Sequence, residues 1–246
     1  MRTTLAAITL AAGLIAVSSA ALPHAATDTT LERMPTALET RYALSALPST
    51  MRDAASVYLL DPAKGYSLAR KGTSGVTCLV ERTAWEQSDY RNDIYVPLCY
   101  DAVGTATYLK VIMDAAALRS QGTVAAALKT TFEQRYRNKT YAAPTRPGVS
   151  YMVAPVMRTW MMPDWNVHTA PMPHLMFYAP NITAGDIGAV PTSGMMYPIA
   201  FREGPPEQSY MVQILGEAER TRIATDEKDL LEALCAYRTT LCLSPQ

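Results

Sequence analysis

Residues 55–82 read ASVYLLDPAKGYSLARKGTSGVTCLVER and hold three short runs of the kind that forms strands. Two clusters of turn-forming residues, DPAKG and KGTSG, separate the runs 55–60, 66–69 and 76–82. Gly supplies positive φ angles at little cost, Pro presets φ, and Asp and Ser hydrogen-bond their own backbone, so such clusters favour tight turns. The stretch therefore predicts three strands joined as an antiparallel meander.

Four more runs further along the chain have the composition of strands, at 94–100, 149–156, 175–179 and 210–215. Pro97 lies inside the first of them and has no N–H to donate to a ladder. We therefore expect 94–100 to be an edge strand or a broken strand.

Three helices are expected between and after these strands. Asp114 is a suitable N-cap for a short helix that ends at Gly122, and Thr123 is one for a longer helix. The longer helix has an apolar stripe at four-residue spacing, made by Val124, Leu128, Phe132 and Tyr136. For the last helix the expected N-cap is Thr225, and the expected buried face is Leu230, Leu231, Leu234 and Tyr237.

This order of elements predicts an α+β fold. We expect a mainly antiparallel sheet, made of the N-terminal meander and the later strands, with about three helices packed on it. The chain has 246 residues, 49% of them hydrophobic, and 22 basic against 22 acidic side chains. That composition excludes a disordered or collagen-like chain, and its charge balance gives no reason to expect a nucleic-acid partner or an anionic membrane surface.

The N-terminus has the features of a cleavable secretory signal. Arg2 supplies a positive charge, residues 5–17 are uncharged and apolar, and small residues follow up to cleavage points near Ala20 or Ala21. The apolar run is too short to span a membrane. We therefore expect a soluble secreted or periplasmic protein, with a signal peptide at 1–20, a poorly ordered leader at 21–50 and one globular domain at 51–246.

Four cysteines follow the signal, and an even number in an oxidising compartment favours disulfides. Cys78 and Cys99 lie in two neighbouring strand-like runs, so we expect them to pair. The remaining pair, Cys235 with Cys242, requires the last helix to end between them, because seven helical residues separate two Cα atoms by about 10.5 Å. A zinc site is disfavoured because the spacings match no CxxC pattern.

The segment 141–202 has only five charged residues but nine of the 17 prolines and eight of the 13 methionines. Such a segment is either core or contact surface. Its densest part, 157–178, has no regular period before residue 175 and is expected to be a loop. The candidate ligand-binding residues in it are Trp160, Met161, Trp165, His168, Met172, His174 and Met176.

Several interpretations of this loop remain open. Methionines can simply fill gaps in a core, and they can also line an adaptable groove for a small apolar ligand or a protein partner. His168 and His174 with nearby thioethers would suit copper or haem. A hydrolase would use His168 or His174 as general base, Asp164 or Asp186 as its orienting partner and Ser193 as nucleophile.

No nucleophile-elbow, metalloprotease, dinucleotide-binding or phosphate-loop motif occurs in the chain. We therefore favour a non-catalytic binding or envelope-associated component that needs no cofactor, with copper or haem binding and hydrolysis as alternatives.

Overall fold

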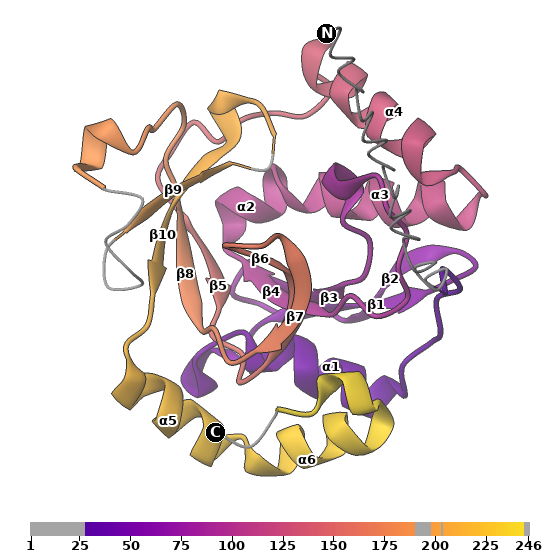
Figure 1. The fold of residues 1–246 in the computed structure, drawn as a ribbon, viewed down its shortest axis with the longest axis vertical. Helices are drawn as coiled ribbons and strands as arrows, with labels where there is room; N and C mark the ends of the chain where they lie inside the picture. The colour runs from indigo at the N-terminus through magenta and orange to yellow at the C-terminus, as the bar shows by residue number, and fades with distance from the viewer. Residues whose placement is uncertain (1–27, 190–197, 203, 244–246) are drawn as a thin grey trace, which may run out of the picture.

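The structure, a computed structural model, describes residues 28–189, 198–202 and 204–243. Its central element is an eight-stranded sheet in the order β2-β1-β3-β4-β5-β8-β10-β9 (Figure 1). The strands are β1 (Ser56–Asp61), β2 (Gly65–Arg70), β3 (Thr77–Glu81), β4 (Val96–Tyr100), β5 (Val149–Met152), β8 (His174–Tyr178), β9 (Ile199–Arg202) and β10 (Ser209–Ile214). A separate two-stranded hairpin consists of β6 (Met157–Met161) and β7 (Asn166–Ala170).

Helices cover both faces of the sheet. On one side in Figure 1 lie α2 (Ala102–Ala106), α3 (Leu109–Ser120) and α4 (Ala125–Arg137), and on the other lie α1 (Thr36–Ser45), α5 (Glu217–Asp226) and α6 (Lys228–Tyr237). All strand pairs except β1 with β3 are antiparallel. The predicted α+β class with a mainly antiparallel sheet is confirmed, although the described residues form six α-helices where about three were expected.

The expected meander over 55–82 is wrong, because β3 pairs with β1 in parallel. The backbone N–H groups of Thr73 and Ser74 donate to the carbonyl of Ala54 just before β1, at 2.8 and 3.0 Å. The connection thus returns to the start of β1, and β3 runs beside it in the same direction. Gly72 permits this approach, since a Cβ there would lie 2.2 Å from the Ala54 carbonyl oxygen.

Of the two alternatives for 94–100, the edge strand is wrong, because β4 lies between β3 and β5, whereas a broken strand agrees with the ladder to β5, which has only two residue pairs. Pairing with β5 begins only at Cys99, opposite Tyr151, so no β5 residue lies beside Pro97 to receive an N–H. On the other side Pro97 faces Val80, whose carbonyl accepts a hydrogen bond from the Tyr66 hydroxyl at 2.7 Å. A short ladder accommodates the proline in a central strand.

The leader expected to be poorly ordered at 21–50 contains α1, a helix that covers the disulfide between β3 and β4. Tyr42 and Ala43 have no exposed surface, and the Tyr42 hydroxyl donates to the Val156 carbonyl at 3.0 Å. The buried residues of α1 are Glu39, Tyr42, Ala43 and Ser45, so its buried face is partly polar, and the hydrophobic pattern of the segment does not reveal it. That expectation is corrected for the described part of the segment.

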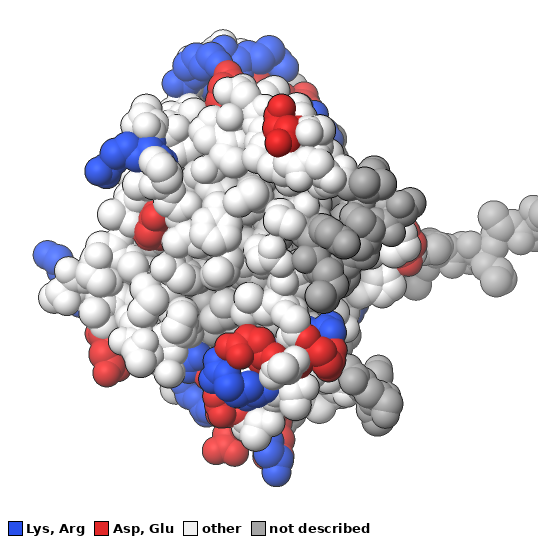
Figure 2. Space-filling view, turned by 90° about the vertical axis from the view of Figure 1, so that its left-hand side faces the viewer, with Lys and Arg blue, Asp and Glu red and all other residues white. Residues whose placement is uncertain are grey.

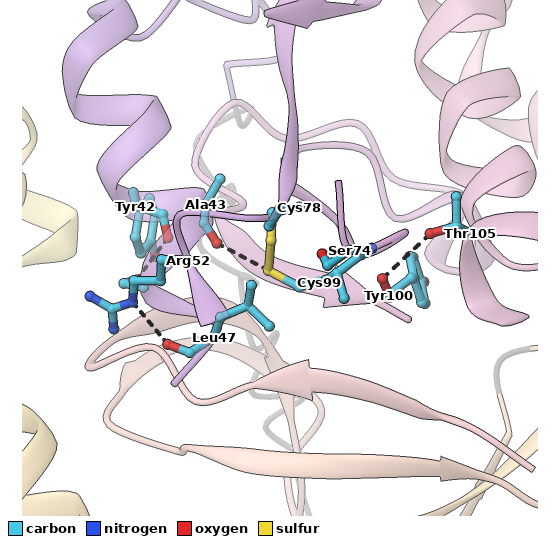
Figure 3. The surroundings of a disulfide bond; sticks show 12 residues. Tyr42, Ala43, Leu47, Arg52, Ser74, Cys78, Cys99, Tyr100 and Thr105 are labelled. Atoms are coloured by element: carbon cyan, nitrogen blue, oxygen red, sulfur yellow. Dashed lines mark hydrogen bonds between the residues drawn. A yellow bond between two sulfur atoms is a disulfide. The ribbon is translucent and has the colours of Figure 1, made fainter. Parts of the chain in front are cut away.

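Cys78 and Cys99 are directly opposite each other on β3 and β4 and form the predicted disulfide, with 4.0 Å between their Cα atoms. The Cys99 sulfur lies 3.4 Å from the carbonyl oxygen of Ala43 in α1 (Figure 3). Cys235 and Cys242 form the second bond. As that bond requires, α6 ends at Tyr237, between the two cysteines.

The helix boundaries differ from those expected from the caps. Asp114 lies inside α3, where it accepts hydrogen bonds from the side chains of Lys110 and Arg135, at 2.9 and 2.8 Å. Val124, expected in the apolar stripe, is the N-cap of α4 and is 66% exposed. Thr225, the expected N-cap of the last helix, lies in the last turn of α5. Helix α5 ends at Asp226, and α6 begins at Lys228. No helix in the described ranges is long and apolar enough to cross a bilayer.

Candidate functional site

The segment predicted to be an irregular loop, 157–178, forms the β6–β7 hairpin and the strand β8. Trp160 and Met161 on β6, together with Met172, are partly buried against the core of the sheet. Trp165 lies at the tip of the hairpin and is 53% exposed, whereas Met176 on β8 is buried. The seven candidate residues are therefore divided between the core, the hairpin flank and the solvent.

The two histidines have different surroundings. His174 is buried and its Nδ1 lies 2.7 Å from the Met172 carbonyl. Burial lowers the pKa of His174, and that carbonyl opposes the effect only in part. His168 is exposed on β7 and its Nε2 contacts Asp164 at 2.9 Å. Among the described residues, no group of three or more His, Cys, Asp and Glu side chains could hold a metal ion.

The residues considered for hydrolysis are only partly assembled. Asp164 and His168 do form the expected contact, at an exposed position. Asp186 instead accepts hydrogen bonds from the backbone and side chain of Thr183, and Ser193 lies outside the described residues. Within the described ranges the His168 ring hydrogen-bonds only to Asp164, so no hydroxyl or thiol is hydrogen-bonded to that ring there.

The low charge of 141–202 corresponds to part of the surface as well as to core. Figure 2 shows a face whose central area has few charged side chains, with charged ones at the top, at the bottom and along the left-hand side of the view. Phe177 on β8 is 36% exposed. It lies in a cross-strand row with Val149 of β5 and Met211 of β10.

A cleft of about 450 Å³ lies elsewhere, between α4, the short 3₁₀ turn η2 (Trp85–Gln87) and the chain that leads into β10. Its walls are Trp85, Glu86, Lys129, Glu133, Tyr136, Arg137, Lys139, Gly204 and Pro205. The volume falls within the usual range of small-molecule sites. None of the seven residues of the Met and His segment lines it.

A much narrower pocket of about 20 Å³ shares Trp85, Glu86, Tyr136 and Gly204 with this cleft. Its other walls are Glu81, Tyr100, Tyr108, Val111, Ile112, Gln208 and Tyr210. Tyr108, Gln208 and Tyr210 are buried. The two hollows are therefore neighbours that share four wall residues, and we call the two together the Trp85 cleft.

The walls of the Trp85 cleft are held in place by direct contacts. Trp85 stacks on Phe132 of α4 with 5.1 Å between ring centroids. Lys129 donates to the Glu86 carbonyl at 2.7 Å, which ties η2 to the same helix. Across the cleft, the Tyr136 hydroxyl donates to Oε1 of Gln208 at 3.1 Å. The site is therefore built on α4 and on the end of the sheet, which are firmly packed elements.

Four tyrosine rings form the deep wall beside the inner pocket. The ring of Tyr108 lies 4.7 Å from that of Tyr210, 4.9 Å from that of Tyr178 and 6.0 Å from that of Tyr100. These residues come from α3's N-cap and from three strands. Aromatic rings at such distances attract each other beyond the area that they bury, so the wall is rigid.

Sequence analysis missed the Trp85 cleft because its residues are scattered from Glu81 to Tyr210 without a shared spacing. Trp85 stands alone in a polar stretch, and a single Trp is a weak signal. Comparison with protein-family models, curated proteins and solved structures finds no match for this chain. The geometry of the cleft must therefore carry the functional inference.

Proposed function

We propose that this protein is an exported binding protein that holds a small ligand in the Trp85 cleft. One observation carries the proposal: a cleft of about 450 Å³ with charged walls shares four wall residues with a narrow pocket that is lined by tyrosines. Ligand sites are concave and largely apolar, with a few polar groups that orient the ligand. Two disulfides are consistent with an oxidising compartment, where exported proteins reside.

The cleft supports this function better than the Met and His segment does. Two of its seven candidate residues, His174 and Met176, are buried, and three more are partly buried against the core of the sheet. The narrow pocket instead has the polar residues Glu86, Tyr136 and Gln208 in its walls. A rigid wall lowers the cost of ordering the site when a ligand binds.

The proposal is tested by filling the opening of the wide cleft, which we call its mouth, with a large side chain. We would screen a mixture of amino acids, amines, carboxylic acids and monosaccharides by ligand-observed NMR. A hit should lose binding in Glu133→Trp, because an indole on this exposed α4 position fills the mouth. Gln134→Trp is the matched control, since Gln134 is exposed on the same helix and lines neither part of the cleft. Equal binding by both variants, or no hit in any class, would contradict the proposal.

A further inference from the structure

The two disulfides differ in how easily solvent reaches them. Cys78 and Cys99 have no exposed surface, and the Cys99 sulfur lies against α1 (Figure 3). Cys235 and Cys242 are each partly exposed, the first in the last turn of α6 and the second just after the 3₁₀ turn η5 (Thr239–Leu241). Exchange between a thiol and a disulfide requires access to a sulfur atom, so a reductant meets the C-terminal bond first.

The segment closed by the C-terminal bond contacts two other parts of the fold. The Arg238 guanidinium donates to the backbone carbonyl of Asn92 at 3.1 Å and to the Tyr95 hydroxyl at 2.9 Å. The Thr240 carbonyl accepts a hydrogen bond from the Thr169 hydroxyl of β7 at 2.5 Å. Arg238 and Thr240 both lie between the two cysteines, so the bond fixes the ends of the segment that makes these contacts.

The disulfide is compatible only with a chain that turns back after α6. The Cα atoms of Cys235 and Cys242 are 4.4 Å apart, whereas a helix continued over seven residues would separate them by about 10.5 Å. The turn places Leu241, which is completely buried, in one core cluster with Leu230 and Leu234 of α6. Without the bond, noncovalent contacts alone would hold this turn, and the segment would open more often.

We propose that the Cys235–Cys242 bond is a redox modification site, which together with residues 236–241 we call the C-terminal clasp. In the oxidised form the clasp holds its contacts with β7 and with the chain before β4. A dithiol, either a small molecule or a protein with a Cys-x-x-Cys pair, reduces the bond and loosens both contacts. This site is separate from the Trp85 cleft and does not depend on ligand binding there.

The exchange is balanced in electrons and protons. A thiolate of the dithiol attacks one sulfur of the bond, forms a mixed disulfide and displaces the other cysteine, which takes up a proton. The second thiol of the reductant then attacks the mixed disulfide and releases the first cysteine as a thiol. Two electrons and two protons pass to the protein, and the dithiol becomes a disulfide. A dithiol is more effective than a monothiol because its second thiol is held close to the mixed disulfide.

Opening the clasp should affect the β6–β7 hairpin through Thr169. Its hydroxyl donates to the Thr240 carbonyl and also accepts a hydrogen bond from the Arg158 guanidinium at 3.0 Å. The same guanidinium is bound to Asp93, and reduction leaves that ion pair in place. We therefore expect the hairpin to loosen without detaching from the sheet.

The first experiment determines which bond opens. The folded mature protein is treated with increasing dithiothreitol, alkylated, digested and analysed by mass spectrometry, while near-UV circular dichroism monitors its fold. We expect Cys235 and Cys242 to be labelled at concentrations about tenfold or more below those that label Cys78 and Cys99. Labelling of the core pair first, of all four cysteines together, or of none before unfolding would overturn the proposal.

Two further reductants in the same assay identify the class of reductant. Glutathione, a monothiol, should label Cys235 and Cys242 only at higher concentration than dithiothreitol does. If it is as effective as dithiothreitol, the preference for a dithiol is wrong. A reduced Cys-x-x-Cys protein at micromolar concentration distinguishes the two sources: efficient labelling supports a protein as reductant, and weak labelling supports a small dithiol.

Hydrogen exchange measures what reduction does to the fold. Selective reduction should raise amide exchange in β7 and in residues 92–95 by about three- to tenfold and leave β3 unchanged. The double variant Cys235→Ser with Cys242→Ser should show the faster exchange without reductant and no further change with it. If that variant fails to fold, the selectively reduced protein still provides the comparison. Unchanged exchange at both places after reduction would overturn the role as a clasp.

Thr169→Val tests the link to the hairpin. Without this hydroxyl, β7 should exchange faster already in the oxidised protein, and reduction should add less there than in residues 92–95. Thr159→Val on β6 is the matched control, because within the described ranges the Thr159 hydroxyl makes no hydrogen bond to residues 238–242. An equal response of β7 to reduction in both variants would overturn the proposed link through Thr169.

Discussion

Two ionisable side chains, Glu39 and Arg82, are buried between α1 and the sheet. The Glu39 carboxylate accepts a hydrogen bond from the Leu60 backbone N–H at 2.9 Å. The Arg82 guanidinium donates to the carbonyls of Ile94 and Asn92, at 2.5 and 2.6 Å, and lies 3.7 Å from the ring centroid of Tyr95. Arg82 is thus satisfied by carbonyls and a ring, whereas Glu39 has one backbone donor.

The burial of Glu39 makes the stability of the protein depend on pH. Burial raises the pKa of Glu39 from 4.5 to about 7, opposed by the Leu60 hydrogen bond and the charge of Arg82. The folded protein therefore binds a proton more tightly than the unfolded chain does, so the free energy of unfolding falls as pH rises from about 4.5 to about 7. The fall attributable to Glu39 should be about 3 kcal/mol.

Urea unfolding at several pH values measures this effect. Glu39→Gln keeps an acceptor for the Leu60 N–H but does not titrate, so its stability should vary less over that range and exceed that of the unaltered protein at pH 8. Glu232→Gln, an exposed carboxyl in α6, is the control and should change neither. An unchanged pH slope in Glu39→Gln would show that Glu39 is not the group responsible.

Helix α4 supports both a hydrophobic cluster and the mouth of the Trp85 cleft. Leu128 and Phe132 are completely buried, next to Trp85. Leu128→Asp should destabilise the protein by about 3 kcal/mol or more, because it buries an unpaired charge. Val124→Asp, one turn earlier, should cost nothing and can add about 0.5–1 kcal/mol, because an Asp at the N-cap accepts a backbone N–H. Thermal unfolding of both variants checks this, and similar losses in the two would contradict the helix orientation.

The β6–β7 hairpin is held to the main sheet through Arg158. This residue forms a two-way backbone bridge with Tyr95, and its guanidinium donates to Asp93 at 2.6 and 3.1 Å and to Thr169 at 3.0 Å. Burial raises the pKa of Asp93, but the hydrogen bonds from Arg91 and Arg158 outweigh it and hold that pKa at about 2. The hairpin is therefore anchored by a partly buried ion pair.

Arg158→Met should destabilise the protein by about 1–3 kcal/mol and increase amide hydrogen exchange in β6 and β7 more than in β3 or β4. The depressed pKa of Asp93 contributes stability above the unfolded value of about 4, which is lost as pH falls toward 2. In the variant that acid-side loss should be smaller and should be complete at a higher pH, because the folded-state pKa of Asp93 then lies closer to its unfolded value. Arg222→Met, at an exposed ion pair of α5, should stay within about 0.5 kcal/mol. Equal exchange in all four strands would contradict the anchoring role.

The two disulfides constrain the whole molecule to different degrees. Cys78–Cys99 spans 21 residues and lies in the core, and Cys235–Cys242 spans 7 at the C-terminal end. Replacing the first pair by Ala should cost about 3 kcal/mol from chain entropy, plus a cavity contribution, and replacing the second about 2 kcal/mol. Urea unfolding without reductant measures both. A free thiol in the unfolded, non-reduced protein would show that one of the two bonds is absent. A larger loss of stability from the C-terminal pair than from the core pair would contradict the ranking.

Local signals predicted most of the strands, both disulfide pairings and the buried positions Leu128, Phe132, Leu230 and Leu234. They failed where distant segments decide the outcome. Thr73 and Ser74 form a turn as expected, but their bonds to Ala54 direct β3 to the parallel side of β1. Likewise α1 is a core helix because Tyr42 and Ala43 pack into the hydrophobic core together with residues of the sheet.

Sequence alone determined what depends on a few neighbouring residues: the alternation of side chains that makes strands, the turns between them, and the four-residue period that buries one side of α4. These patterns act through backbone geometry within one or two turns of chain. Strand order, the central place of β4 and the Trp85 cleft were decided only by the tertiary structure. The cleft joins residues from Glu81 to Tyr210. Such a site exists only when burial of the whole core offsets the entropy lost in bringing them together.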